Sequence, residues 1–175
     1  MAETSKEHVH SDERKLLKEL LKDARENVST VAKNTHFSTQ KVRLMINQLE
    51  KNNTIWGYSA VYDEEKIGLK HFVLLVKRNN NKINEQTVDQ IISRALEDFA
   101  ADFDTFIESS FYVHGEYDWI ITFVTKDINH ALKFSESVLA QNPGIIERVT
   151  ILQTMMFIRK HYILNPGRMK LKEYL

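Results

Sequence analysis

The chain has 175 residues, of which 42% are hydrophobic and 27% charged, with equal numbers of basic and acidic side chains. This composition excludes a disordered chain and supplies a core for one domain or two small ones. The absence of cysteine excludes disulfides and thiolate metal sites.

The charge is distributed unevenly along the chain. Residues 1–60 have a net charge of +2, residues 61–160 of −4 and residues 161–175 of +2. Mildly basic ends and an acidic middle indicate that the two parts of the chain face different partners. The N-terminus lacks the apolar core of a signal peptide, and no apolar run is long enough to span a bilayer. We therefore expect a cytoplasmic protein with no membrane partner.

The first predicted helix begins near Ser11, after a polar segment that we expect to be frayed. Ser11 is a candidate N-cap, and Asp12 and Glu13 would lie in the first turn, where the helix dipole favours acids. Leucines follow at helical spacing and predict one buried face. This face comprises Leu16, Leu17, Leu20, Leu21 and Ala24.

Residues 27–49 predict two short helices joined by a tight turn. Asn27 and Ser38 are both suited to cap a helix N-terminus. After Ser38 the apolar residues recur at i, i+3, i+4 and i+7, which predicts a single inward face. That face comprises Val42, Met45, Ile46 and Leu49. Together with the first helix, this pair predicts a three-helix head.

The outward face of the second helix in this pair carries side chains that can contact phosphates and base edges. We expect Lys41 and Arg43 to clamp phosphates, as in the recognition helix of a helix-turn-helix. The side-chain amides of Gln40, Asn47 and Gln48 would form hydrogen bonds with base edges. The candidate DNA-binding residues are Ser38, Thr39, Gln40, Lys41, Arg43, Asn47 and Gln48. The alternative is an ordinary solvated helix face.

The second half of the chain predicts a βαββαβ order, the split ferredoxin-like unit. An aromatic strand over residues 54–62 and a charged turn over 63–68 precede it. The predicted elements are strands at 71–76, 106–114, 119–124 and 149–158, a helix over 88–99, and a second helix capped by Asp127 and stopped at 142–144. One sheet face carries the helices, and we expect a second copy of the chain to cover the other.

Several local motifs occur in an order that resembles the Lrp/AsnC family of transcriptional regulators. The matching residues are Asp12, Leu16-Leu17, Ala24-Arg25, Val31-Ala32, Phe37-Ser38, Leu49-Glu50, Ile55 and Gly57-Tyr58 in the first part, and 113–118, Pro143-Gly144-Ile145 and Thr150 in the second. Each motif is short, and their order and spacing carry the resemblance. It extends from about residue 12 to residue 158.

The resemblance implies an α+β fold. Residues 1–60 would form an N-terminal three-helix winged or helix-turn-helix DNA-binding domain, and 61–69 a linker. Residues 70–160 would form a C-terminal βαββαβ ferredoxin-like (RAM-type) domain for effector binding and oligomerisation, followed by a tail over 161–175. It also implies a sequence-specific regulator of double-stranded DNA that forms homodimers, which in this family often assemble into tetramers of dimers.

The family binds small effectors, commonly amino acids, near the turn at 113–118. Carried over, Gly115 would admit a ligand to the backbone, and Asp118 would accept a hydrogen bond from an α-ammonium group. The alternative is that both residues merely form a β-turn. The candidate effector-binding residues are His114, Gly115, Glu116, Asp118 and Thr150.

Three positions depart from the family pattern. His36 and Asn53 stand where glycine is usual, so these turns must form without it, and asparagine tolerates a left-handed conformation. Met45 replaces the usual recognition-helix arginine, which moves a phosphate contact to Lys41 or Arg43 or removes it. These departures concern the DNA target rather than the fold.

Two other functions compete with this reading. An enzyme resembling the haem-pathway decarboxylases has the same two-part architecture, and His71, His114 and His130 could converge at one sheet edge. However, the sequence contains no nucleophile motif, phosphate loop or clustered metal ligands, so we expect no catalytic residue, metal or cofactor. The second competitor is an architectural DNA-binding protein without an effector.

Overall fold

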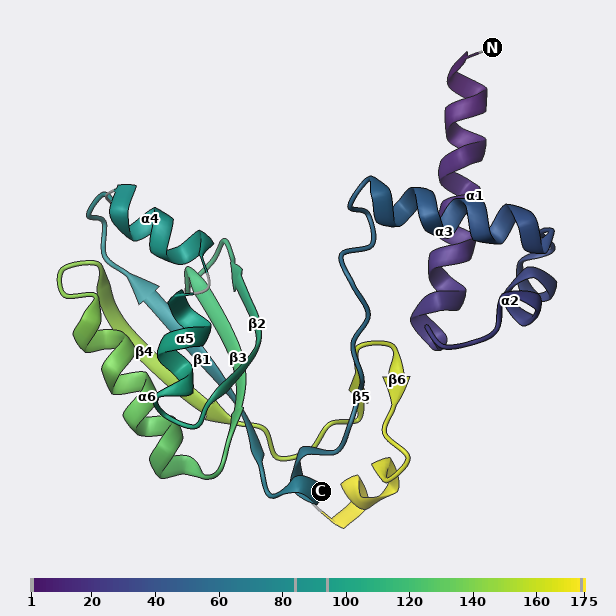
Figure 1. Ribbon diagram of the computed structural model, residues 1–175. Helices are drawn as coiled ribbons and strands as arrows, with labels where there is room; N and C mark the ends of the chain where they lie inside the picture. Colours follow the sequence, from purple (N-terminus) through teal and green to yellow (C-terminus); the bar gives the residue numbers. More distant parts are fainter. Residues whose placement is uncertain (1, 84, 94, 174) are drawn as a thin grey trace. The chain divides into compact units, whose positions relative to one another are not determined.

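The computed structural model describes residues 2–83, 85–93, 95–173 and 175, and the chain forms two compact units (Figure 1). One unit comprises Met1–Val61 and Phe157–Leu175, and the other comprises Tyr62–Met156. Met1 of the predicted head and Tyr174 of the predicted tail lie outside the described residues.

The first unit contains three helices, α1 (Ala2–Lys22), α2 (Val28–Thr35) and α3 (Thr39–Lys51). Their inner faces meet in a small hydrophobic core, to which Met45 and Ile46 add partly buried side chains. The buried members of this core are Leu16, Val31, Ala32, Val42 and Leu49. The apolar spacing in the sequence predicts this core, since residues three and four apart lie on one helix face.

Helix α1 begins at Ala2, so the prediction that Ser11 caps the helix is wrong. Two side-chain contacts span this position within the helix. The ring Nδ1 of His10 lies 3.1 Å from a carboxylate oxygen of Glu13, and Nε of Arg14 donates to the carbonyl of His10. Such contacts between residues three and four apart favour a continuous helix.

The predicted strand at 54–62 is also wrong, because no strand is assigned in these residues. Their backbone makes no ladder with any described strand, and a lone extended segment cannot form a sheet. Trp56 is 94% exposed. Near the C-terminus, β5 (Arg159–Lys160) and β6 (Ile163–Leu164) form a short hairpin, followed by the 3₁₀ helix η2 (Arg168–Glu173).

The second unit is a four-stranded antiparallel sheet in the order β2-β3-β1-β4. The 3₁₀ helix η1 (Glu64–Ile67) closes the charged turn at Gly68 and leads into the sheet. The strands are β1 (Lys70–Arg78), β2 (Phe106–Tyr112), β3 (Trp119–Thr125) and β4 (Ile146–Gln153). With its helices, this order is the predicted βαββαβ arrangement, although β4 begins and ends earlier than predicted.

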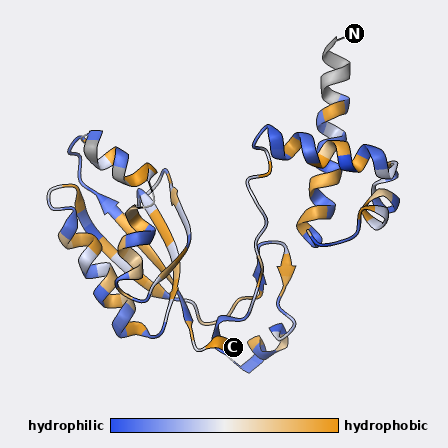
Figure 2. Ribbon diagram, in the orientation of Figure 1, coloured by the Kyte–Doolittle hydropathy of each residue, from blue (hydrophilic) through white to orange (hydrophobic). Residues whose placement is uncertain are grey.

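Helices α4 (Glu85–Ile92), α5 (Ala95–Ala101) and α6 (Ile128–Gln141) lie on one side of this sheet (Figure 1). Phe72, Leu74 and Ile121 point into the core between the layers and are completely buried. Phe134 of α6 packs edge-on against Phe123 of β3 at 5.0 Å between ring centroids. Hydrophobic residues run along the strands, whereas α6 carries both hydrophobic and hydrophilic residues (Figure 2).

The single helix predicted over 88–99 is wrong, because α4 ends at Ile92 and α5 begins at Ala95. Between them, Oγ of Ser93 accepts a hydrogen bond from the Ala95 amide at 3.3 Å. Arg94 lies outside the described residues. Apolar residues recur at helical spacing from Val88 to Phe99, through both helices, so this spacing alone could not reveal the break.

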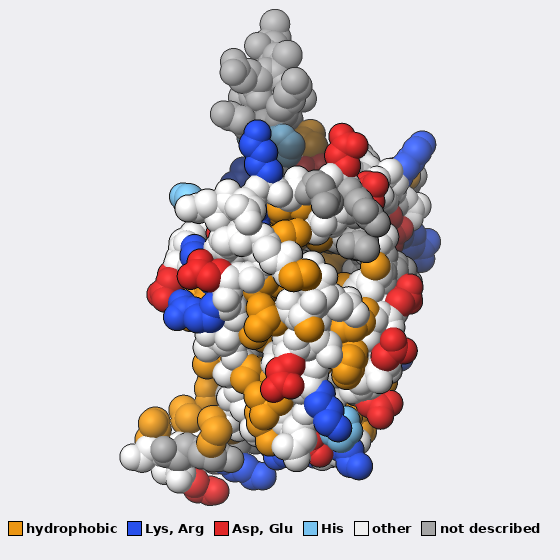
Figure 3. Space-filling model, turned by 90° about the vertical axis from the view of Figure 1, so that its left-hand side faces the viewer, with side chains coloured by type: hydrophobic (Ala, Val, Ile, Leu, Met, Phe, Trp, Pro, Cys, Tyr) orange, Lys and Arg blue, Asp and Glu red, His pale blue; other side chains and the backbone are white. Residues whose placement is uncertain are grey.

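The face of the sheet opposite the helices remains partly apolar and exposed. Val73 and Leu75 point to this side because they alternate with the buried residues of β1. Leu152, paired with Val73, is 50% exposed, and Phe111 of β2 is 45% exposed. Figure 3 shows the molecule from the left-hand side of Figure 1, and hydrophobic side chains gather across the middle of that view. Within the described residues, no helix has the length and hydrophobicity needed to cross a membrane.

Candidate nucleic-acid interface and effector turn

The turn between α2 and α3 has the conformation of a helix-turn-helix without a glycine. Oδ1 of Asn27 accepts from the Thr30 amide at 2.9 Å and caps α2, as predicted. His36 ends α2 in the left-handed region, with φ 60° and ψ 34°. Oγ of Ser38 then accepts from the Lys41 amide at 3.1 Å and caps α3, which confirms the second predicted cap.

Helix α3 buries one face and exposes the other. Val42 and Leu49 are 0% and 1% exposed and hold the helix against α1 and α2. The side chains predicted to contact DNA all lie on the exposed surface of the first unit. They are Ser38, Thr39, Gln40, Lys41, Arg43, Asn47 and Gln48. The geometry thus presents hydrogen-bonding groups along a rigid, capped helix.

Leu44 lies among these polar residues and was missed by the sequence reasoning. It is 61% exposed, and helical geometry places it between Gln40 and Asn47 on the outward face. The signal was present in the sequence, since Leu44 falls outside the spacing of the buried positions. An apolar side chain at this place can contact a thymine methyl group.

Lys41 and Arg43 have different surroundings, although the sequence suggested equal roles. Nζ of Lys41 lies 2.6 Å from Oδ2 of Asp12 on α1, and 4.2 Å from the centre of the Phe37 ring. The hydrogen bond from Lys41 lowers the pKa of Asp12. The side chain of Arg43 is exposed and makes no hydrogen bond or ion pair within the described residues. Arg43 is therefore the more available cation on α3.

The turn between β2 and β3 contains four of the five predicted effector residues, and the fifth, Thr150, lies on β4. Oδ2 of Asp118 accepts from the Arg78 amide at 2.9 Å and lies 3.2 Å from Nζ of Lys77. These contacts, the Arg78 hydrogen bond foremost, lower the pKa of the Asp118 carboxyl. Asp118 is thus held ionised by neighbours on β1. A Cβ added at Gly115 would meet no atom within 4 Å, so the backbone there is open.

The other effector candidates are linked by two residues that the sequence reasoning did not single out. The hydroxyl oxygen of Tyr117 lies 3.5 Å from Oγ1 of Thr150. The Arg148 guanidinium lies over the Tyr117 ring at 5.6 Å and donates to Glu116 at 3.5 Å. His114 is exposed. The β2–β3 turn and β4 therefore bring Glu116, Tyr117, Arg148 and Thr150 together.

Two of the three histidines considered for an enzyme, His71 and His130, have separate partners, and the third, His114, is exposed. Nδ1 of His71 lies 2.6 Å from Oγ1 of Thr154, and its Nε2 lies 3.1 Å from Glu108. His130 contacts Asp127 at 2.8 Å, where Asp127 caps α6 as predicted. Among the residues that the structure describes, no cluster of three or more His, Asp or Glu side chains could hold a metal ion.

Comparisons with known proteins agree with this architecture. The chain is 24% identical over 151 residues to the regulatory protein AsnC of Haemophilus influenzae, covering 85% of this chain and 91% of that protein. No protein-family model matches the chain.

Solved structures share the fold. An AsnC family transcriptional regulator from Agrobacterium tumefaciens is 21% identical, with a TM-score of 0.63 over 88% of this chain and 95% of that one. A transcriptional regulator from Neisseria meningitidis, solved as an L-Met complex, is 20% identical, with a TM-score of 0.58 over 90% and 97%. The chain is therefore similar in sequence to a regulatory protein AsnC, and in fold to an AsnC family transcriptional regulator, over most of its length.

Proposed function

We propose that this chain regulates transcription by binding double-stranded DNA through α3. The observation that carries the proposal is the exposed polar face of a helix whose start is fixed by the Ser38 cap. A helix of this kind fits the major groove, where a distinct pattern of donors and acceptors identifies each base pair.

Each exposed side chain has a role that follows from its chemistry. Ser38 and Thr39 lie at the N-terminus of α3, where amides and hydroxyls favour a phosphate. Arg43 would contact a second phosphate. Base edges would be read by the amides of Gln40, Asn47 and Gln48, with Leu44 against a thymine methyl group. Lys41 would contact phosphate only after leaving Asp12.

A homodimer would supply two such helices. The exposed apolar face of the sheet, which includes Val73, Leu75 and Leu152, is suited to packing against a second copy of the chain. Two heads on one dimer make the second DNA contact intramolecular and predict two-fold symmetric half-sites. Further assembly into tetramers of dimers belongs to the same proposal.

A small effector, an amino acid in our proposal, would bind near the β2–β3 turn. The open backbone at Gly115 would admit a carboxylate to the turn amides. The ionised Asp118 would attract an α-ammonium group, and Thr150 with Glu116 and His114 would set the choice of side chain. The L-Met complex of the Neisseria regulator motivates the choice of an amino acid.

The test is a mobility-shift assay of the full chain on a pool of random duplexes. We expect binding at moderate salt that the double substitution Arg43→Gln with Asn47→Ala reduces by about tenfold or more, because a phosphate and a base contact are lost. Lys51→Gln at the far end of α3 removes one exposed charge and serves as the matched control. Equal losses in both variants would reject α3 as the reading helix, and sequence-indifferent binding would favour an architectural protein.

A further inference from the structure

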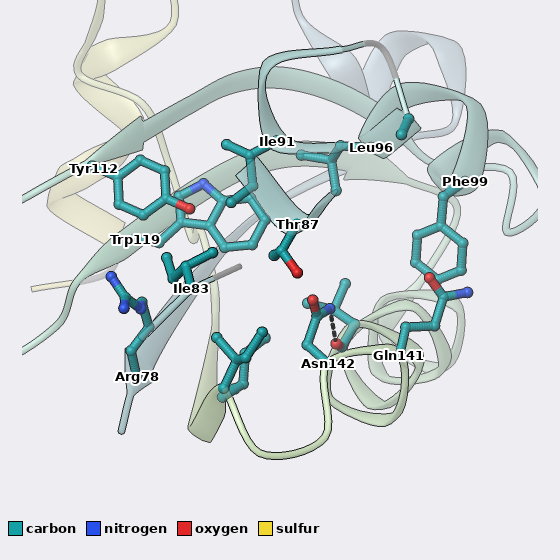
Figure 4. Close-up of a pocket in the computed structure, with 14 residues that line it drawn as sticks. Arg78, Ile83, Thr87, Ile91, Leu96, Phe99, Tyr112, Trp119, Gln141 and Asn142 are labelled. Carbon is teal, nitrogen blue, oxygen red and sulfur yellow. Dashed lines mark hydrogen bonds between the residues drawn. The ribbon is translucent and has the colours of Figure 1, made fainter. Parts of the chain in front are cut away.

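A cavity of about 300 Å³ lies inside the second unit, apart from the effector turn (Figure 4). Residues of α4 and α5, the C-terminal end of α6 and the ends of β1, β2 and β3 line it. This volume is at the lower end of the range for small-molecule sites. The cavity therefore suits a compact ligand.

Its walls are mainly apolar and aromatic. Ile91 of α4, Leu96 of α5 and Phe99 of α5 line one part of the cavity. Tyr112 and Trp119 line another, with their rings stacked at 5.8 Å and nearly parallel. Such walls favour a flat ring or a branched hydrocarbon, since apolar contact area contributes most to the binding of small ligands.

Arg78 brings a positive charge to the edge of this apolar space. Figure 4 shows its guanidinium group beside Tyr112. One terminal nitrogen donates to the Asn81 carbonyl at 3.4 Å, but Nε is buried and has no hydrogen-bond partner within the described residues. A buried donor without a partner is costly, so a ligand acceptor at this place would be stabilising.

The remaining lining groups are consistent with an anionic ligand. The described lining residues include no acidic side chain. The hydroxyl of Thr87 points toward the middle of the cavity in Figure 4. Nδ2 of Asn142 already donates to the Val138 carbonyl at 2.8 Å, which orients that amide. Burial raises the pKa of Tyr112, so its hydroxyl stays neutral at physiological pH and can donate a hydrogen bond.

We propose that this cavity binds a small carboxylic acid with an aromatic or branched apolar body, its carboxylate on Arg78 and its body among Ile91, Phe99 and Trp119. Arg78 is held for this role by its backbone amide, which donates to Asp118 at 2.9 Å. The site lies within one chain. Its existence does not depend on DNA binding or on an effector at Gly115.

The two tryptophans of the chain allow a direct test. Trp56 is 94% exposed in the first unit, whereas Trp119 is 9% exposed and lines the cavity. In full-length protein carrying Trp56→Phe, emission therefore reports on Trp119 alone. Titration with phenylacetate is expected to change this emission saturably. Phenylacetamide has the same ring without the charge and should bind about tenfold more weakly, the loss expected for one charge-assisted contact.

Two substitutions in the same background locate the binding. Arg78→Gln should remove the preference for phenylacetate over phenylacetamide, and Ile91→Phe, which adds bulk to the cavity without adding a tryptophan, should weaken the response to both at least tenfold. Lys133→Gln removes an exposed charge on α6, outside the cavity, and should change neither affinity. If Arg78→Gln does not fold by circular dichroism, Arg78→Lys keeps the charge and should keep the preference.

Three results would overturn the proposal. They are the absence of a saturable response to phenylacetate, equal affinities for the acid and the amide in the parent protein, and an unchanged affinity in a folded Ile91→Phe variant. Loss of DNA binding in any of these proteins would bear on the proposed function only, so the two proposals fail separately.

Discussion

The ammonium group of Lys41 on α3 lies 2.6 Å from a carboxylate oxygen of Asp12 on α1. This ion pair joins the proposed DNA-reading helix to the first helix and places a negative charge beside the surface proposed to meet phosphates. Because both side chains are partly exposed, the pair stabilises the fold only slightly. Its larger effect is expected on DNA binding.

We predict that Asp12→Asn tightens DNA binding. The substitution removes a charge that repels phosphates and releases Lys41 to contact one, so the plot of log affinity against log salt should steepen by about 0.9 for each bound head. Stability should fall by less than about 1 kcal/mol. Affinity measured at several salt concentrations checks the slope.

The control for this prediction is Glu13→Gln on the same helix, whose carboxylate contacts His10 rather than α3. It should leave the slope nearly unchanged. Equal slopes for the parent protein and Asp12→Asn would mean that Lys41 does not reach the DNA.

We predict that Arg43→Gln weakens binding to all DNA sequences about equally. The side chain of Arg43 is an exposed cation in the first half of α3 without a partner in the described part of the chain, and a phosphate contact carries no base preference. The plot of log affinity against log salt should become shallower by about 0.9 for each bound head.

Asn47→Ala, by contrast, should reduce the discrimination between DNA sites by about 1–3 kcal/mol, because a base contact is lost. Competition with mismatched duplexes separates these effects.

His36 offers a prediction about stability alone. Its φ of 60° is unfavourable for a residue with a Cβ, so His36→Gly should stabilise the first unit by about 0.5–1 kcal/mol. His36→Val should destabilise it, because a β-branched residue disfavours this conformation. Chemical denaturation of both variants provides the measurement, with Lys33→Gly inside α2 expected to cost about 1 kcal/mol.

Asp118 predicts a pH dependence of stability. Its pKa is lowered in the folded protein, chiefly by the Arg78 amide, so the ionised carboxyl stabilises the fold above its unfolded pKa of about 3.9. This contribution is lost as the pH falls through the folded pKa. Asp118→Asn should therefore cost about 1 kcal/mol at pH 7 and progressively less below about pH 4.

Urea denaturation at pH 7 and pH 3 measures this difference, with Glu136→Gln on the exposed side of α6 as the control. A difference between Asp118→Asn and the parent protein that persists unchanged at pH 3 would exclude the ionised carboxyl as its cause.

Local rules predicted much of the fold. The caps at Asn27, Ser38 and Asp127 depend on side chains that bond to amides two or three residues along the chain, so sequence alone reveals them. Asparagine was expected to tolerate a left-handed conformation in the turn after α3, and Asn53 has a φ of 57°. The βαββαβ order follows from alternating periods of hydrophobicity.

Features that depend on partners distant in sequence could not be predicted. Lys41 and Asp12 are far apart in the chain, so their ion pair could not be predicted. Lys41 was therefore expected to contact phosphate in the same way as Arg43. The aromatic residues at 54–62 have strand propensity, but no described strand pairs with them. The cavity beside Arg78 exists only once α4, α5 and α6 have packed on the sheet of the second unit.

The central claim is that two α3 helices of a dimer read DNA. The most direct measurement is selection of binding sites from a random duplex pool by the full chain, with and without a mixture of amino acids. The account predicts a two-fold symmetric site whose affinity changes with at least one amino acid. No enrichment of any sequence at moderate salt would contradict it.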